Sequence, residues 1–396
     1  HGHIRYIPQM NSVRLFDARG ELLFSTEETP RQINVADRAH FQRARDTVRD
    51  ELVISEVVRS RSTDRDAVVD VVSESQRDTG AAGANAAGAS GSAAAVADFM
   101  APLALGTQTA GSIIRPAACC GVVGIKPSFG RVPAYPLSPM GTVAHLGPHT
   151  MSVRDAALMM NVLKQADARD WTALPADASD YTVGLEDGIR GLRIAYSPTL
   201  GYAQHVHPEI AASVDAAVRQ LQALGAHVEQ VDPGFEDPLG ITTGLWFLGA
   251  YTVWSGLSAQ QQALADPDFR AEAEMGAQLS ALQIQQLNQR RGVLGSHMRQ
   301  FMQRYDLLVT PSVAVPAFEA RAAGSVPMNP ASMLGWTPFS YPFNLTQQPA
   351  ITVPCGLTKA GLPMGLQFVG PMFGDALVLR AARAYESVQP VLRPVI

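Results

Sequence analysis

The stretch Leu103-Ala-Leu-Gly-Thr-Gln-Thr-Ala-Gly-Ser-Ile-Ile-Arg-Pro-Ala117 contains the pattern that decides the expected fold. The small residues Thr109, Ala110 and Gly111 stand directly before Ser112. Small side chains let backbone N–H groups converge on one point, and such donors form an oxyanion hole, where one donor lowers a reaction barrier by about 3–4 kcal/mol. A serine hydroxyl beside this nest can attack a carbonyl carbon. Gly-Ser pairs also occur in ordinary turns, so these residues alone favour a structural turn over a nucleophile.

On the C-terminal side of this stretch, the hydrophobic pattern alternates between strands and helices. Residues 191–196 are typical of a buried strand, residues 208–224 of a helix with one apolar stripe, and residues 227–231 of a further strand. A strand, a helix and a strand joined by short loops predict parallel pairing, with helices over the sheet faces. Further strands are expected at residues 306–310, 350–354 and 364–369, and a tightly packed helix at residues 93–100.

Three segments resemble a known family. The segments "GSAAAVADFMAPLALG" (91–106), "GTQTAGSIIRPAACCGVVGIKPSFGRVP" (106–133) and "FNLTQQPAITVPCGLTKAGLPMGLQFVGP" (343–371) are similar, in this order, to the amidase signature family. The resemblance covers residues 90–396 and implies an α/β fold with a mixed central β-sheet covered by helices on both faces. It also implies hydrolysis or transfer at a carboxamide, a nucleophile at Ser112, and an oxyanion hole from the backbone of Thr109, Ala110, Gly111 and Ser112.

The general base of that family is a lysine that acts through a second serine held in a cis peptide bond, and this chain departs from the pattern. Residues 86–92 read Ala-Ala-Gly-Ala-Ser-Gly-Ser, which places Gly88 at the cis-serine position. No lysine precedes Lys126, and arginine stays protonated, so it cannot replace a lysine base. Lys126 lies in the matching segment "GIKPSFG", where a structural role is favoured over that of a substitute base. We therefore expect both parts of the proton relay to be missing.

Other side chains near this stretch are weaker candidates. Arg115 follows the nucleophile turn, where packing or an internal ion pair is favoured over contact with a substrate. His145 and His149 lie in a segment similar to the family's Gly-Pro turn. We interpret both histidines as structural or substrate-lining residues rather than bases.

The composition disfavours several classes of function. The 396 residues carry a net charge of −5, too mild to indicate nucleic-acid binding, and no run of about 18 apolar residues predicts a membrane span. His205-Val-His207 has a spacing that can bind metal, but a solvated pair before a helix is favoured. The three cysteines show neither a disulfide framework nor a metal-ligand spacing. We expect no metal, no cofactor, no signal peptide and a cytoplasmic location; the oligomeric state is not indicated.

Residues 1–78 are much richer in charged residues than the remainder. Residues 12–17 and 21–25 predict a hairpin, Asp37 is placed to begin a helix, and residues 51–58 predict a third strand. This order resembles part of the Cache sensory domains, so residues 1–78 are expected to form a small, partial α/β segment. The Gly/Ala-rich residues 79–89 are typical of a flexible join, and residues 90–396 would form the amidase-like domain.

These observations favour a hydrolase of a small carboxamide that acts through Ser112 with strongly impaired turnover. Three alternatives stay open: a non-catalytic protein that keeps the fold and a binding cleft, a small-molecule sensory module formed by the Cache-like segment, and a fused or misassembled chain. The first hypothesis predicts that Ser112 lies on a turn before a buried segment, with its hydroxyl facing a cleft. The composition shift predicts few contacts between residues 1–78 and the amidase-like part.

Overall fold

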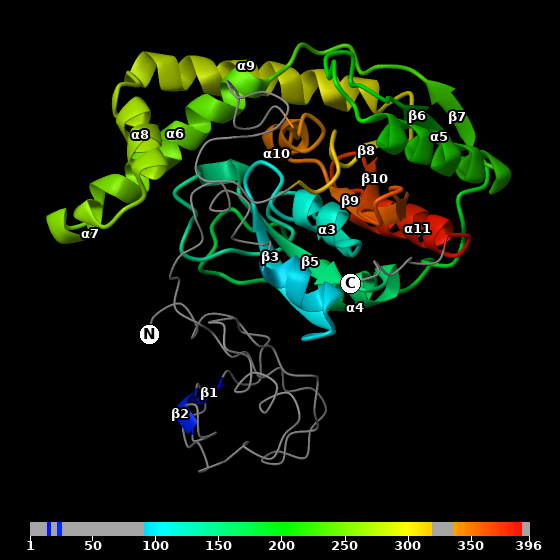
Figure 1. Ribbon diagram of the computed structural model, residues 1–396, viewed down its shortest axis with the longest axis horizontal. Coiled ribbons are helices and arrows are strands. Elements are labelled where there is room, and N and C mark those ends of the chain that lie inside the picture. Colours follow the sequence, from blue (N-terminus) through cyan, green and yellow to red (C-terminus); the bar gives the residue numbers. More distant parts are fainter. Residues whose placement is uncertain (1–13, 17–21, 26–90, 319–335, 390–396) are drawn as a thin grey trace.

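The larger of the two described sheets forms the centre of the molecule. The computed structural model describes residues 14–16, 22–25, 91–318 and 336–389 (Figure 1). Eight of the described strands form one sheet in the order β3-β5-β4-β9-β10-β8-β6-β7. Their bounds are β3 Leu103–Gln108, β4 Val123–Lys126, β5 His145–Thr150, β6 Arg193–Tyr196, β7 His227–Gln230, β8 Leu307–Pro311, β9 Ala350–Leu357 and β10 Pro363–Val369.

The sheet is mixed in strand direction. β6 is parallel to β7 and β8, whereas the pairs from β3 across to β8 are antiparallel. The predicted parallel unit is confirmed: β6, α5 (Pro208–Ala223) and β7 follow one another, and the two strands pair in parallel. β9 and β10 pair antiparallel because the connection from Leu357 to Pro363 is far shorter than the dozen or so residues that a parallel crossover needs.

Helices cover both faces of the sheet. α4 (Val153–Leu163), α5 and α11 (Asp375–Glu386) pack on one face. α3 (Ile114–Cys120), α9 (Ala281–Phe301) and α10 (Tyr341–Leu345) pack on the other. Successive side chains of a strand point to opposite faces, so Leu307 and Val309 of β8 join the first core and Leu308 joins the second. The α/β architecture predicted from the sequence, a mixed sheet between two helical layers, is therefore confirmed.

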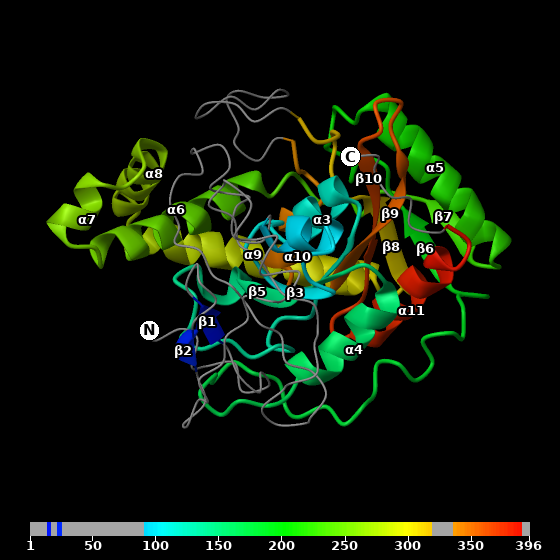
Figure 2. The same cartoon turned by 60° about the horizontal axis from the view of Figure 1, so that its bottom comes forward.

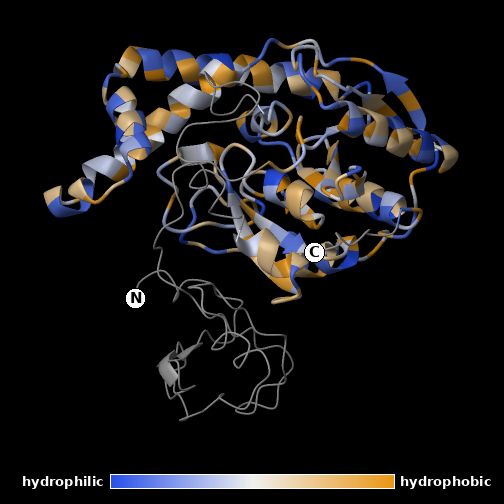
Figure 3. Ribbon diagram, viewed as in Figure 1, coloured by the Kyte–Doolittle hydropathy of each residue, from blue (hydrophilic) through white to orange (hydrophobic). Residues whose placement is uncertain are grey.

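A helical arm extends from the second face. α6 (Leu239–Ser255) runs beside α9, while α7 (Ala259–Ala263) and α8 (Pro267–Ala277) lie farthest from the sheet in both ribbon views (Figures 1 and 2). α6 contains no charged residue, and its apolar residues are spread around the helix rather than gathered on one side; Figure 3 colours this helix, like the others, by hydropathy. It is fixed to α8 by the Trp246 indole, which donates to Glu272 over 2.9 Å. In the described part of the chain, every helix is too short or too polar to cross a membrane.

The N-terminal predictions can be compared with the structure only in part. β1 (Arg14–Phe16) and β2 (Leu22–Ser25) pair antiparallel, which confirms the predicted hairpin. The helix expected from Asp37, the strand at residues 51–58 and the join at residues 79–89 lie outside the described residues. The helix predicted at residues 93–100 is found at residues 91–97 and ends in a turn. The proposed domain boundaries therefore stay predictions.

Candidate active site

Ser112 lies in the connection between β3 and α3. β3 ends at Gln108, and α3 begins at Ile114, so four residues before the helix N-cap form a tight turn. Ser112 is 8% exposed and Ala110 is fully buried. The first five residues of α3 are buried as well, in agreement with the buried segment predicted after the nucleophile turn. The turn and the buried segment are thus present, whereas Ser112 is not among the residues that line the described cavity, so the expectation that its hydroxyl faces a cleft stays a prediction.

The backbone N–H groups of this turn fall into two sets. The side-chain oxygen of Gln108 accepts from the N–H groups of Ile113 and Ile114 over 2.8 and 2.9 Å. By contrast, no acceptor among the described residues takes the N–H group of Ala110 or Gly111. Buried N–H groups without an acceptor are rare in folded proteins, so two in succession before a serine are a candidate anion nest. They belong to the four residues, Thr109 to Ser112, predicted to form the oxyanion hole.

A network of amides behind the turn holds Gln108. The Gln108 side-chain N–H donates to the Asn344 side-chain oxygen over 2.8 Å. The Asn344 amide N–H donates in turn to the backbone oxygens of Gln108 and Val143, over 3.1 and 2.9 Å. Gln108 and Asn344 are each 1% exposed, so solvent does not compete for these bonds. α10 therefore fixes the end of β3 from which the nucleophile turn departs.

Arg115 is buried beside the nucleophile. It is 3% exposed, and one terminal nitrogen donates to the Ser112 Oγ over 3.4 Å. Its guanidinium carbon lies 5.2 Å from the centroid of the Trp336 ring, within the range of a cation–π contact. Burial lowers the pKa of Arg115 to about 10, which still leaves it charged at neutral pH. Of the two roles expected for Arg115, packing or an internal ion pair, the described residues show packing, on Trp336, and no described carboxylate pairs with it.

Lys126 is at the end of β4 and is fully buried. Its amine donates to the carbonyl oxygens of Pro127, over 3.2 Å, and of Gln348. Burial lowers the Lys126 pKa to about 7, while the buried carboxylate of Asp375 opposes that shift. These contacts tie β4 to the segment before β9, as a structural role requires, and no described hydrogen bond joins Lys126 to Ser112.

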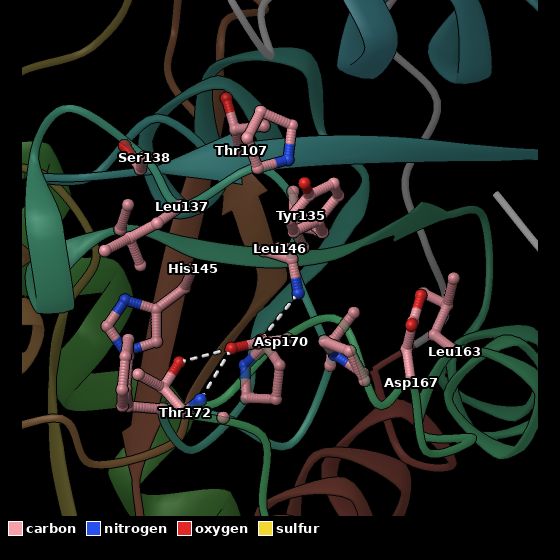
Figure 4. Close-up of a pocket in the computed structure, with 18 of the residues that line it drawn as sticks. Thr107, Tyr135, Leu137, Ser138, His145, Leu146, Leu163, Asp167, Asp170 and Thr172 are labelled. Atoms are coloured by element: carbon pink, nitrogen blue, oxygen red, sulfur yellow. Dashed lines mark hydrogen bonds between the residues drawn. The ribbon is translucent and has the colours of Figure 1, made fainter. Parts of the chain in front are cut away.

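His145 lines a cavity of about 550 Å³ next to the turn (Figure 4). Its Nδ1 lies 2.9 Å from the Val143 carbonyl oxygen, which assigns the ring proton to Nδ1; Nε2 has no partner among the described residues. Burial lowers the pKa of His145 well below its ordinary value, so the ring stays neutral. His149 instead lies in the core, where its Nε2 is 3.0 Å from the Ile113 carbonyl oxygen and burial lowers its pKa to about 4.

The walls of this cavity are largely apolar. Figure 4 shows the lining residue Asp170, whose carboxylate accepts from the N–H and hydroxyl groups of Thr172. Asp170 also accepts from the backbone N–H of Ala134 over 2.8 Å, so its oxygens are already used. Among the lining residues, Thr109 connects the cavity with the nucleophile turn. The volume falls within the range of small-molecule pockets. Other lining residues include Leu105, Thr107, Val132, Tyr135, Leu137, Leu146 and Leu163.

Several residues singled out in the sequence lie away from this site or outside the residues that the structure describes. Gly88 lies outside the described residues. His207 is the N-cap of α5, where its Nδ1 accepts from the Glu209 N–H over 3.3 Å. In the described ranges, no cluster of three metal-ligating side chains is found, and the three cysteines are free.

The sequence reasoning missed three residues of the site: Gln108, Ser340 and Asn344. Gln108 and Asn344 fall inside the stretches that suggested the family, and both are polar residues within apolar segments. Polar side chains in such positions are usually buried with hydrogen-bond partners, which was the available signal. The pairing itself was not readable, because Gln108 and Asn344 are 236 positions apart.

Comparison with known proteins agrees with this architecture. The family model described as Amidase matches residues 84–379, and the chain belongs to the amidase family. It is 35% identical over 315 residues to an acylamidase of Rhodococcus erythropolis, covering 77% of this chain and 66% of the relative. It is 34% identical over 332 residues to a component of the glutamyl-tRNA(Gln) amidotransferase of Synechococcus sp. (strain CC9902), covering 76% of this chain and 66% of that relative.

Solved structures show the same fold. A bacterial aryl acylamidase of the amidase signature family superposes with a TM-score of 0.67 and 31% identity, covering 76% of this chain and 65% of that one. A 6-aminohexanoate cyclic dimer hydrolase complexed with substrate gives a TM-score of 0.69 and 25% identity, covering 77% and 69%. The chain thus spans slightly less than two-thirds of the length of the curated relatives it matches.

Proposed function

We propose that this chain acts on small carboxamides through Ser112, as a hydrolase with strongly impaired turnover. The observation that supports this most is the pair of buried N–H groups, at Ala110 and Gly111, without an acceptor among the described residues. They directly precede a serine that is itself nearly enclosed. Membership of the amidase family supplies the class of reaction, cleavage of a C–N bond.

The chemistry would follow from this geometry. The Ser112 Oγ attacks the amide carbon, its proton leaves, and the carbonyl oxygen becomes an oxyanion that accepts from the nest. Collapse of the tetrahedral intermediate expels the amine, which takes up a proton, and leaves an acyl ester on Ser112. Water then hydrolyses the ester and regenerates the hydroxyl. The positive charge of Arg115, 3.4 Å from the Ser112 Oγ, favours negative charge on these oxygens.

The proposed loss of the proton relay limits the expected rate of turnover. General-base assistance raises a reaction rate roughly 10²–10⁴-fold. When catalytic residues that act as a unit are lost together, the rate falls by far more than the loss of one interaction would explain. The family resemblance requires a lysine and a cis-serine, and this chain has Gly88 at the serine position and no lysine before Lys126. The Lys126 amine is the single alternative base that we retain, since its pKa is about 7. Its two contacts to carbonyl oxygens favour a structural role.

The surroundings support an amide with an apolar group. The cavity beside Thr109 has about 550 Å³ and mostly apolar walls. The open Nε2 of His145 at its edge is an acceptor for a donor group on the ligand. Two of the relatives are named as an acylamidase and an aryl acylamidase, and these names are compatible with such a ligand. We therefore place His145 and Arg115 among the residues that line the substrate.

The test compares turnover with binding. Hydrolysis of a panel of primary and aryl amides should be little above background in the unmodified chain, and Ser112→Ala should remove what remains. Calorimetric binding of the same amides should be measurable in both chains. If the unmodified chain hydrolyses amides at ordinary enzyme rates and Ser112→Ala abolishes this, the relay is not missing. Lys126→Met then shows whether this lysine is the base.

The proposed loss of the relay would also favour one alternative, a non-catalytic protein that binds amides without cleaving them. This alternative predicts equal binding by the unmodified and Ser112→Ala chains, with no detectable acyl ester after rapid acid quenching and mass spectrometry. A trapped ester on Ser112 would exclude it. The impaired hydrolase predicts a small but measurable amount of that ester.

A further inference from the structure

The Ser340 hydroxyl contacts the nucleophile turn from the opposite side to Gln108. It donates to the carbonyl oxygen of Ala110 over 2.8 Å, and both residues are buried. We propose that Ser340 is a positioning residue that sets the orientation of the peptide between Ala110 and Gly111, and thereby aims the Gly111 N–H into the oxyanion nest. The inference rests on the proposed role of Ser112, because it concerns how the nest beside that residue is built.

The argument begins with the geometry of the peptide unit. In a trans peptide the C=O of one residue and the N–H of the next point in opposite directions. Among the described residues the only cis peptide is between Tyr135 and Pro136, so the unit between Ala110 and Gly111 is trans. A hydroxyl that holds the Ala110 oxygen on one side therefore holds the Gly111 N–H on the other side. That N–H is one of the two without a described acceptor.

The close approach of Ser340 depends on glycine at position 111. The Gly111 backbone has a φ of +139°, which side chains rarely adopt. A β-carbon built there would lie 2.2 Å from the Ser340 Oγ and 2.7 Å from the Arg115 Nε. The space that a side chain would fill is thus occupied by the hydroxyl that orients the peptide. This mutual fit indicates that the Ser340 contact is part of the turn and not an incidental neighbour.

Ser340 itself is held in place. Thr337 Oγ1 lies 2.8 Å from the Ser340 Oγ and can donate to it while Ser340 donates to Ala110. The neighbouring carbonyl of Phe339 accepts from the Gln367 side chain on β10 over 2.8 Å. The hydroxyl therefore projects from a segment anchored to the centre of the sheet, and it can impose an orientation on the turn. Without it, the buried Ala110 oxygen would lack a partner, and rotation of the peptide would be favoured.

The experiment measures two quantities: the affinity of the nest for an oxyanion mimic and the orientation of the peptide between Ala110 and Gly111. Phenylboronic acid serves as the probe, because boron gains a fourth bond from the Ser112 Oγ, the hydroxyl proton passes to solvent, and a boronate oxygen occupies the nest. We expect Ser340→Ala to weaken this affinity at least about tenfold, given that a single oxyanion donor is worth 10²–10³ in rate. Ser340→Thr keeps a hydroxyl and should restore affinity to within about threefold of the unmodified chain, well inside the loss expected for that donor.

Ser312→Ala is the matched control. Its hydroxyl is also fully buried and lies 2.6 Å from the Thr352 Oγ1, so its removal carries a similar stability cost away from the turn. Affinity equal to that of the unmodified chain is expected for this variant. Equal affinities for Ser340→Ala and Ser312→Ala, with both chains folded by thermal unfolding, would overturn the proposal.

Crystal structures separate this proposal from the function it rests on. If the unmodified chain and Ser112→Ala bind phenylboronic acid equally, the nucleophile role of Ser112 fails. The orientation of the Ala110–Gly111 peptide in the Ser340→Ala crystal then decides the positioning role alone. A rotated peptide supports it, and an unchanged peptide overturns it.

Discussion

At the scale of single residues, Gly111 combines two constraints, its backbone conformation and the nearness of Ser340. We predict that Gly111→Ala destabilises the fold by about 1–3 kcal/mol for the unfavourable φ and a further 1–3 kcal/mol for overpacking. Gly141 provides the control, since its φ is +61° but nothing lies within 4 Å of an added β-carbon. Urea unfolding of both variants measures the difference. Equal losses of unfolding free energy in the two variants would show that the Ser340 side chain moves aside for the added methyl group at no cost.

A second prediction at the residue scale concerns how the stability of the fold depends on pH, and it follows from the lowered pKa of Lys126. The unfolded lysine holds its proton to about pH 10.5, whereas the folded one holds it only to about pH 7. Between these values the unfolded state binds more protons, so stability rises with pH from about 7, with a limiting slope of about 1.4 kcal/mol per pH unit. The burial penalty is fully present below pH 7. The stability should be measured between pH 7 and 9. Above this range the buried thiols, whose pKa values are raised by burial, lower the stability of the fold as pH rises and so oppose the effect of Lys126.

Denaturant unfolding of the unmodified chain and of Lys126→Met between pH 6 and 9 checks this. The variant should lose most of the rise between pH 7 and 9 and should gain stability relative to the unmodified chain at pH 6. Identical slopes in the two chains would mean that Lys126 keeps its proton in the folded state, in spite of its burial.

The residues of the candidate site were predictable to different degrees. Ser112 and the nest could be proposed from the family resemblance of a contiguous stretch, because the small residues before the serine, taken alone, favour a structural turn. The contact between Gln108 and Asn344 and the contact between Ser340 and Ala110 could not be predicted, because each joins positions far apart in the sequence. For Arg115 the sequence left packing and an internal ion pair open; the described residues show packing on an aromatic ring, a choice of partner that the sequence does not distinguish.

At the scale of elements, α9 supports the segment that holds the turn. Arg291 on α9 donates to the Leu345 carbonyl oxygen over 2.8 Å and to the hydroxyl and carbonyl oxygens of Thr142 over 2.7 and 3.0 Å. We predict that Arg291→Met destabilises the fold by about 1–3 kcal/mol, because it leaves the carbonyl at the end of α10 without this donor. Arg290→Met, at the exposed neighbouring position, should change stability by less than about 0.5 kcal/mol. Thermal unfolding distinguishes them; equal shifts would contradict the supporting role of Arg291.

The sequence predicted those elements whose signals are local. α5 follows from its apolar stripe, with a proline at its start and Gly225 after its end, and the structure gives Pro208–Ala223. The antiparallel direction of β9 and β10 could have been predicted, because the strands expected at residues 350–354 and 364–369 leave too few residues between them for a parallel crossover. α6 was not anticipated, because it is apolar all round and therefore lacks the one-sided stripe on which helix prediction relies.

At the scale of the whole molecule, the division of the chain is a testable prediction. The composition shift and the Gly/Ala-rich residues 79–89 predict that limited proteolysis cuts there first and releases a stable piece beginning near residue 90. Mass spectrometry of the fragments gives the cut sites, and thermal unfolding of the larger fragment gives its stability. Uniform resistance across residues 79–89 would instead indicate one integrated domain.

The bond between Ser340 and Ala110 has a consequence for synthesis of the chain, because its partners are 230 positions apart. At about 5–20 residues per second, a ribosome needs on the order of 10–50 seconds to travel from one to the other. During that interval the nascent chain contains Ser112 but lacks the hydroxyl that orients the adjoining peptide. Contacts of such long range also form late in folding, because loop closure precedes them. The nest is therefore expected to form only after the C-terminal strands have joined the sheet. In incomplete chains, Ser112 would be present without an oriented oxyanion nest beside it.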